Sequence, residues 1–187
     1  MKKAILSLGV LAALMTGSVG MASAASSTVN FAGKILPNTC DVSVNGTVGT
    51  TTVTLPYIAL PDMPTTAGSV SASGRTPFTI GLSNCSGGLA AGEQARIKFV
   101  GTPDAAVTTA ISNTGTSTGG AIYIATAAAP AVALDPTTGE DIGPNTAQTA
   151  AQLEALTLPM VAGYISTSAT PTVGTALGQV EFVYDVV

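Results

Sequence analysis

The C-terminal stretch of this chain, 174–187, alternates over most of its length between apolar and other side chains. Val180, Phe182, Tyr184 and Val186 share one face of an extended backbone, because successive side chains of a β-strand point to opposite sides. The pattern therefore predicts a half-buried β-strand. Since the sequence ends there, we expect no later strand to pair beside it.

A second alternating stretch, 28–36, lies near the other end of the sequence. Its odd positions, Val29, Phe31, Gly33 and Ile35, form one face. We interpret the two stretches as complementary, with this stretch of one molecule completing the sheet beside the C-terminal strand of another. The alternative is that both are ordinary strands of a self-contained sandwich, and the residues alone leave the two interpretations open.

The start of the chain has the three parts of a secretory leader. Lys2 and Lys3 supply the positive charge, 4–15 is apolar, and the A-S-A sequence at 22–24 fits the small-residue cleavage pattern. The apolar run is too short to cross a membrane as a helix, and no later stretch is long enough. We therefore expect export without membrane insertion.

Cleavage after residue 24 of the 187 leaves a length that suits one domain. We divide the chain into a signal peptide, 1–24, an N-terminal extension, 25–37, and one domain, 38–187. All ten acidic residues but only four of the six basic residues lie beyond the leader, which gives a formal net charge of −6. No basic patch is available for nucleic acid or anionic lipid.

Composition favours an all-β fold. Thr, Val and Ile are frequent and favour strands, whereas the 21 Gly and 11 Pro residues interrupt the chain at short intervals. Asn45-Gly46 is a strong signal for a tight hairpin turn. One short helix is predicted over 146–156, capped by Asn145 or Thr146. The other predicted strands are 40–44, 51–55, 78–82, 95–99, 107–111, 121–124 and 158–165.

The two cysteines, Cys40 and Cys85, are expected to form a disulfide, because their number is even and the chain is exported. A metal or redox pair is disfavoured because the chain has no histidine and no C-x-x-C motif. The absence of histidine also removes the common nucleophilic triads. The acidic cluster of Glu140, Asp141 and Asp135 lacks calcium-loop spacing and is interpreted as a solvated turn. We therefore expect no catalytic residue, metal or cofactor.

Several motifs together resemble the pilins of bacterial chaperone–usher fimbriae, close to type 1 and F17-like major subunits. Gly174 occupies the fourteenth position from the C-terminus, where this family has a glycine. Val186 stands where the family favours an aromatic residue, and Tyr184 is the nearest aromatic. The matching motifs are N-F-A-G-K-I (30–35), F-T-I-G-L-S-N-C (78–85), A-R-I-K-F-V-G-T (95–102) and L-P-M-V-A-G-Y (158–164).

The resemblance implies an incomplete immunoglobulin-like sandwich that lacks its last strand. A periplasmic chaperone would first complete it, and the N-terminal strand of the next subunit would replace the chaperone at an outer-membrane usher. By this resemblance Phe31 and Ile35 fill the groove, Val29 adds a contact, and Gly33 lies where the groove is shallow. The groove edge and chaperone contact would comprise Gly174, Val180, Phe182, Tyr184 and Val186.

The resemblance thus implies a structural subunit of a surface fimbria, one that polymerises by donor-strand exchange and supports adhesion. The alternatives are a minor or tip-proximal subunit and a secreted glycan-binding sandwich module. A two-domain tip adhesin is disfavoured because almost nothing precedes 28–36 after the leader. A secreted hydrolase is disfavoured by the missing histidine and motifs.

Overall fold

A computed structural model of the chain describes residues 33–36 and 38–187. The leader, together with Val29 and Phe31 of the predicted donor face, lies outside the described residues. Ile35–Val187 forms one unit, and the fold below is that of this unit. Of the preceding unit only Gly33 and Lys34 are described, and neither belongs to a helix or strand.

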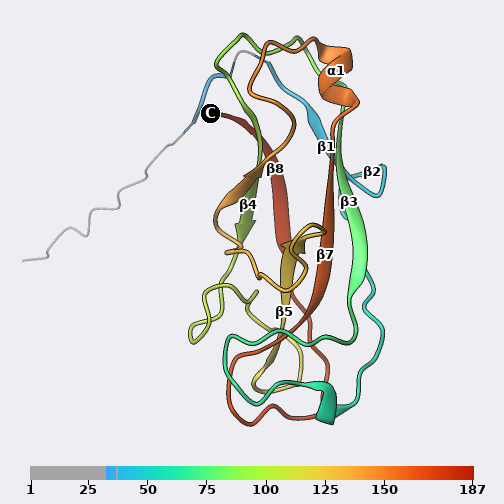
Figure 1. The fold of residues 1–187 in the computed structure, drawn as a ribbon, viewed down its shortest axis with the longest axis vertical. Helices are drawn as coiled ribbons and strands as arrows, with labels where there is room; N and C mark the ends of the chain where they lie inside the picture. Colours follow the sequence, from blue (N-terminus) through green and yellow to red (C-terminus); the bar gives the residue numbers. More distant parts are fainter. Residues whose placement is uncertain (1–32, 37) are drawn as a thin grey trace, which may run out of the picture. The chain divides into compact units, whose positions relative to one another are not determined.

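The larger sheet is antiparallel, with strand order β2-β1-β3-β7-β5 (Figure 1). The hairpin between β1 and β2 contains the expected tight turn, with Asn45 at φ 51° and Gly46 at φ 77°. Such positive φ values suit Asn and Gly and match the twist of a two-residue hairpin. The strands are β1 (Asp41–Val44), β2 (Thr47–Val48), β3 (Thr76–Ser83), β5 (Gly120–Thr126) and β7 (Thr157–Ser166).

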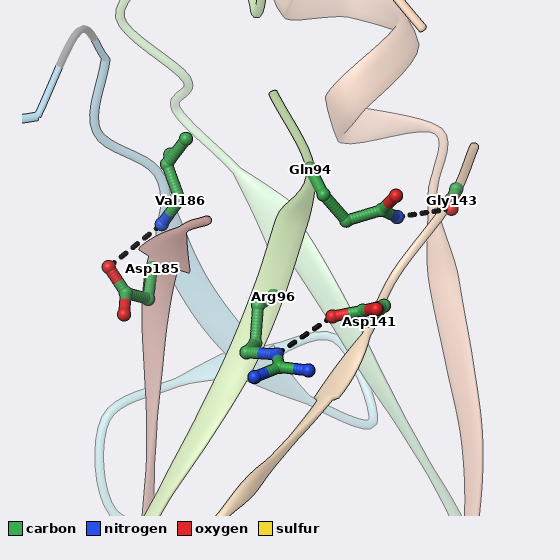
Figure 2. Close-up of polar contacts among 6 residues, drawn as sticks. All are labelled: Gln94, Arg96, Asp141, Gly143, Asp185 and Val186. Carbon is green, nitrogen blue, oxygen red and sulfur yellow. Dashed lines mark hydrogen bonds and ion pairs between the residues drawn. The ribbon is translucent and has the colours of Figure 1, made fainter. Parts of the chain in front are cut away.

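The smaller sheet consists of β6 (Gly139–Asp141), β4 (Ala95–Gly101) and β8 (Val180–Val186), in that order. β6 falls where the sequence predicts only a turn. Side chains attach it to β4 (Figure 2): Arg96 Nε lies 2.7 Å from Asp141 Oδ1, and Gln94 Nε2 donates to the Gly143 carbonyl at 2.7 Å. An all-β fold of two antiparallel sheets is thereby confirmed.

The core lies between the inner faces of the two sheets. Ile80 of β3, Ile97 and Phe99 of β4, and Met160 of β7 are at most 1% exposed. These residues alternate with more exposed ones along β3 and β4, as the period of two requires. Full burial of such a side chain contributes about 1.5–3 kcal/mol, so the facing pairs hold the two sheets together.

The predicted strand over 107–111 is wrong. Within it only Ile111 forms isolated bridges, to Pro103 and Ile122, and the residues before it form turns. Ala110 packs instead against the outer face of the larger sheet, in a second cluster with Tyr123. The apolar run therefore marks a loop that covers a sheet face.

The predicted helix is shorter than expected and begins later. α1 spans Ala150–Glu154, and Thr149 caps it through a reciprocal capping box with Gln152. Thr146 lies in a bend, and Gln148 forms a β-bridge with Leu89 through backbone hydrogen bonds of 2.8 and 3.0 Å, so the helix does not include residues 146–148. A short 3-10 helix, η1, spans Leu60–Asp62. The part of the chain that the structure describes contains no helix long and apolar enough to cross a membrane.

Candidate functional site

β8 is paired along one edge only. Val187 and Gln94 exchange two backbone hydrogen bonds, at 2.8 and 3.0 Å, and are therefore a hydrogen-bonded pair of the β4–β8 ladder. Because bonded and non-bonded pairs alternate in an antiparallel ladder, the odd-numbered residues of β8 bond to β4. The backbone groups of Val180 and Phe182 therefore point to the opposite edge, with which no described strand pairs.

Across a groove from that edge lies the extended segment 49–55, which we name the opposite wall. Thr51, Val53 and Leu55 are half-buried, whereas Thr52 and Thr54 between them are exposed. This is the strand-like alternation that the sequence predicts over 51–55. The segment nevertheless forms no ladder with any described strand.

The backbone of the opposite wall is hydrogen-bonded from one side. The carbonyls of Thr54 and Pro56 accept hydrogen bonds from the hydroxyls of Thr76 and Tyr164, both at 3.1 Å. Because backbone groups alternate sides in an extended chain, those of Leu55 between them point the other way, towards the groove that Leu55 lines. The Thr51 hydroxyl, which lines the groove, is buried without a hydrogen-bond partner among the described residues.

The groove between these two edges has a volume of about 650 Å³. The inner face of the larger sheet forms its apolar floor, and residues 178–182 form the β8 side. Two unpaired edges above an apolar floor provide what an extended peptide needs, since backbone groups pair at the edges and alternate side chains enter the groove. The floor residues of this sheet are Val42, Val44, Phe78, Ile122, Ile124 and Ala162, and Ile111, which bridges to Ile122, extends the floor.

Phe182 connects the floor to the smaller sheet. Its ring centroid lies 6.0 Å from that of Phe78 on β3 and 5.6 Å from that of Phe99 on β4. The contact with Phe99 is edge-to-face, an arrangement that aromatic rings favour. Phe182 itself is half-buried, so part of its ring remains available to a side chain entering the groove.

The groove is closed at the end nearer the disulfide, which we name the disulfide end. Tyr184 and Val186 are buried and do not line the groove. The Tyr184 hydroxyl donates to Asn38 Oδ1 at 3.0 Å, and Asn38 is 2% exposed. Burial raises the pKa of Tyr184.

The free edge of β8 is also blocked at this end. The Val186 N–H, which belongs to that edge, donates to Oδ1 of the neighbouring Asp185 at 2.8 Å (Figure 2). A side chain that occupies an edge donor removes it from pairing with another strand. The available edge of β8 is therefore its first half, where Val180 and Phe182 lie.

The predicted site residues fall into three groups. Cys40 and Cys85 are joined in one disulfide, as the sequence predicts. Val180 and Phe182 line the groove, while Tyr184 and Val186 lie in the core beyond its closed end. Gly174 does not belong to β8. It lies in the preceding loop, where a Cβ would come 2.4 Å from the Ser117 backbone nitrogen, so close backbone approach explains this glycine.

The described part of the predicted donor face consists of Gly33 and Ile35. The Ile35 side chain is fully exposed. No described residue lies within 4 Å of the position that a Cβ on Gly33 would occupy. The exposed Ile35 side chain therefore does not belong to the core of the described fold.

Sequence reasoning missed the opposite wall and Asn38 as parts of the site. The alternation over 51–55 is visible in the sequence, but nothing there shows that the segment faces β8. Asn38 precedes Cys40 by two residues and carries no motif of its own. Among the described residues, no three His, Cys, Asp or Glu side chains gather as a metal ion would require.

Comparisons with known proteins identify the family of this chain. The family model described as Fimbrial protein matches residues 29–186. Among solved structures, one similar chain is the Burkholderia pseudomallei antigen and type I fimbria protein, at 20% sequence identity and a TM-score of 0.44, covering 80% of this chain and 94% of that one. No curated protein matches. Because the family match extends over far more than half of the sequence, this chain belongs to the fimbrial protein family.

Proposed function

We propose that this fimbrial subunit polymerises by donor-strand exchange. In this proposal the groove accepts the stretch 28–36 of another copy, and the same stretch of this chain enters the groove of the next. The observation that carries the proposal is the pair of unpaired backbone edges flanking an apolar groove. Strand addition to an exposed sheet edge is a known recognition mode, and chaperone–pilin complementation is an established instance of it.

The closed end of the groove sets the direction of the inserted strand. The body of the donor copy follows residue 36, and the chain leading to it leaves the groove where the groove is open. That open end lies where β8 begins, near Gly178. The donor strand therefore runs antiparallel to β8, which is also the slightly more stable pairing.

The length of the groove selects a register. Between 178 and 182 the inner face of β8 and the residues just before it offer three positions for alternate side chains. Three donor residues fill these positions when Ile35 lies opposite Gly178, Gly33 opposite Val180 and Phe31 opposite Phe182. Val29 then lies towards the closed end.

This register also accounts for the glycine in the donor face. A Cβ placed on Gly101, which faces Val180 across β4 and β8, would lie 3.3 Å from Val180 Cγ2 and 3.1 Å from Pro136 Cβ. Val180 and Pro136 thus already fill the space on the inner face of the smaller sheet beside Gly101. A donor residue without a side chain suits that position.

Before polymerisation the groove needs another occupant, since an unfilled apolar groove with free backbone donors favours aggregation. We assign this role to a periplasmic chaperone, and the exchange of strands to an outer-membrane usher. The finished fibre lies on the cell surface and supports adhesion. The partners are therefore identical or related subunits, a chaperone and an usher.

Peptide complementation tests the groove directly. A synthetic peptide of residues 28–36 is added to the purified mature chain, and thermal unfolding is followed. We expect the peptide to raise the melting temperature, because a ligand that binds only the folded state stabilises it. A control peptide with Phe31→Ser and Ile35→Ser keeps the backbone and removes the two large groove-filling side chains, and it should have little effect.

Electron microscopy of cells that express the chain with a chaperone and an usher tests the assembly. Long fibres made mainly of this protein support the proposal. Soluble monomers with affinity for a glycan, and no response to the peptide, would indicate a secreted binding module instead.

A further inference from the structure

Two exposed apolar side chains flank the open end of the groove. The Tyr57 side chain is fully exposed, at 102%, and follows the lining residue Leu55 by two positions. Leu177 is 56% exposed and immediately precedes Gly178 on the other side. Each side of the groove thus continues into an exposed apolar residue. We name Tyr57 and Leu177 the mouth residues.

A chain of contacts inside the fold shows that the two sides of the groove reach the same point along its length at the mouth. Tyr164 donates to the Pro56 carbonyl at 3.1 Å and lies opposite Ile122 in the β5–β7 register. Ile122 bridges to Ile111, and a Cβ on Gly178 would lie 2.9 Å from Ile111 Cγ2. The two sides therefore end together at the edge of the same floor.

A very short connection joins the donor stretch to its own folded body. One residue separates Leu36 from Asn38, and Asn38 is fixed in the body by Tyr184 and by a 3.4 Å hydrogen bond to the Gly87 carbonyl. Two residue steps span at most about 7 Å. When the donor strand fills a groove, the disulfide end of the donor copy must therefore lie against the mouth.

The two surfaces are chemically compatible. No charged residue occurs in 42–61 or in 155–180, the segments that hold the mouth residues. The contact therefore avoids repulsion between acidic copies at this point. The disulfide end offers small exposed residues, among them Ser86, Gly87 and Ala90. A tyrosine can pack its ring against such small residues and keep its hydroxyl in water.

We propose that Tyr57 and Leu177 form a second contact between neighbouring copies, against the disulfide end of the copy whose strand fills the groove. This inference rests on the proposed donor-strand exchange. It adds to the inserted strand a direct contact between the folded domains of neighbouring copies. Tyrosine is often an energetically dominant residue at protein interfaces. The contact orients successive subunits, which the inserted strand alone does not do.

Photo-crosslinking in assembled fibres tests this contact. p-Benzoylphenylalanine replaces Tyr57, or Val132 as the control, because Val132 is also exposed, at 60%, and belongs to a loop away from the groove. The position 57 probe should cross-link to a second copy at 38–40 or 85–94, and the position 132 probe should not. Cross-links from position 57 only to its own chain, or to other regions of a second copy, would overturn the proposal.

A second measurement separates the contact from the groove. Tyr57→Ala should leave binding of the 28–36 peptide unchanged, because the peptide lacks the folded domain that would contact Tyr57. The same substitution should speed fibre dissociation by about tenfold or more. Assembly that fails with intact peptide binding also supports the contact. Unchanged dissociation, or weakened peptide binding, overturns it. If the unsubstituted chain binds no peptide and forms no fibres, the proposed function itself fails.

Discussion

Gly33 offers the sharpest test of how this chain recognises its own copies. No described residue lies within 4 Å of the place of its Cβ, and its φ is not in the left-handed region. Glycine in a strand normally costs stability through backbone entropy and lost packing. Under the proposed donor-strand exchange, the reason for a glycine here lies in the partner's groove.

In the proposed register Gly33→Trp places a large ring opposite Val180, where Val180 and Pro136 already occupy the space beside Gly101. Overpacking of a filled site costs about 1–3 kcal/mol. If the inserted strand is formed in the transition state of exchange, polymerisation slows by about 5- to 150-fold, since each 1.36 kcal/mol is a factor of ten. Folding of the substituted subunit itself should be unaffected.

The assay compares chaperone complexes of the variants, purified in equal yield, by following polymer formation over time on gels. Lys34→Trp is the matched control, because it adds the same ring to the neighbouring outward position, and Lys34→Ala shortens the side chain and removes its charge. Both should polymerise at nearly the unsubstituted rate. Gly33→Trp polymerising as fast as the unsubstituted subunit, from an equally good complex, would refute the assignment of this face as the donor face.

Three further predictions concern the fold that holds the groove. Replacing Cys40 and Cys85 by serine opens a link between residues 45 positions apart and should lower the unfolding free energy by about 4 kcal/mol; urea denaturation measures this, and an unchanged midpoint would contradict it. Tyr184→Phe leaves Asn38 Oδ1 buried without its donor and should cost about 1–3 kcal/mol, seen as a lower melting temperature, whereas Tyr57→Phe at an exposed position should cost nothing measurable. Burial raises the pKa of Tyr123, Tyr164 and Tyr184 above the ordinary value of 10.0. The unfolded chain therefore ionises first, and stability should be complete below pH 10 and fall as the pH rises above it; a melting temperature that stays constant above pH 10 would show that these tyrosines do not contribute.

Periodicity predicted most strands because it depends only on neighbouring residues. Alternation marked β3, β4 and β8, and the Asn45-Gly46 turn fixed the first hairpin. It failed where tertiary contacts decide the conformation. Ala147 and Gln148 are good helix formers, but Gln148 pairs with Leu89, which is distant in sequence, and the helix begins only after the Thr149 cap.

The groove was predictable in part for the same reason. Alternation placed Val180 and Phe182 on the inner face of the last strand. It did not show where the groove ends, because Tyr184 and Val186 continue the same pattern and yet lie in the core. The boundary depends on the hydrogen bond between Tyr184 and Asn38, whose residues are 146 positions apart. No local pattern records such a contact.

A free sheet edge attracts any extended chain, so a subunit of this kind needs to restrict what its edge accepts. The structure restricts it by position: Asp185 occupies the Val186 donor, and Tyr184 with Asn38 closes the groove beyond Phe182. What remains is a short edge above an apolar floor that opens at one end. A strand that fits must have apolar residues at alternate positions and a residue without a side chain opposite Val180. Its own folded domain must also begin directly after its last residue. The stretch 28–36 meets the first two conditions, and the single residue between Leu36 and Asn38 meets the third. Under the proposed donor-strand exchange, these three conditions together favour the chain's own copies over other extended chains.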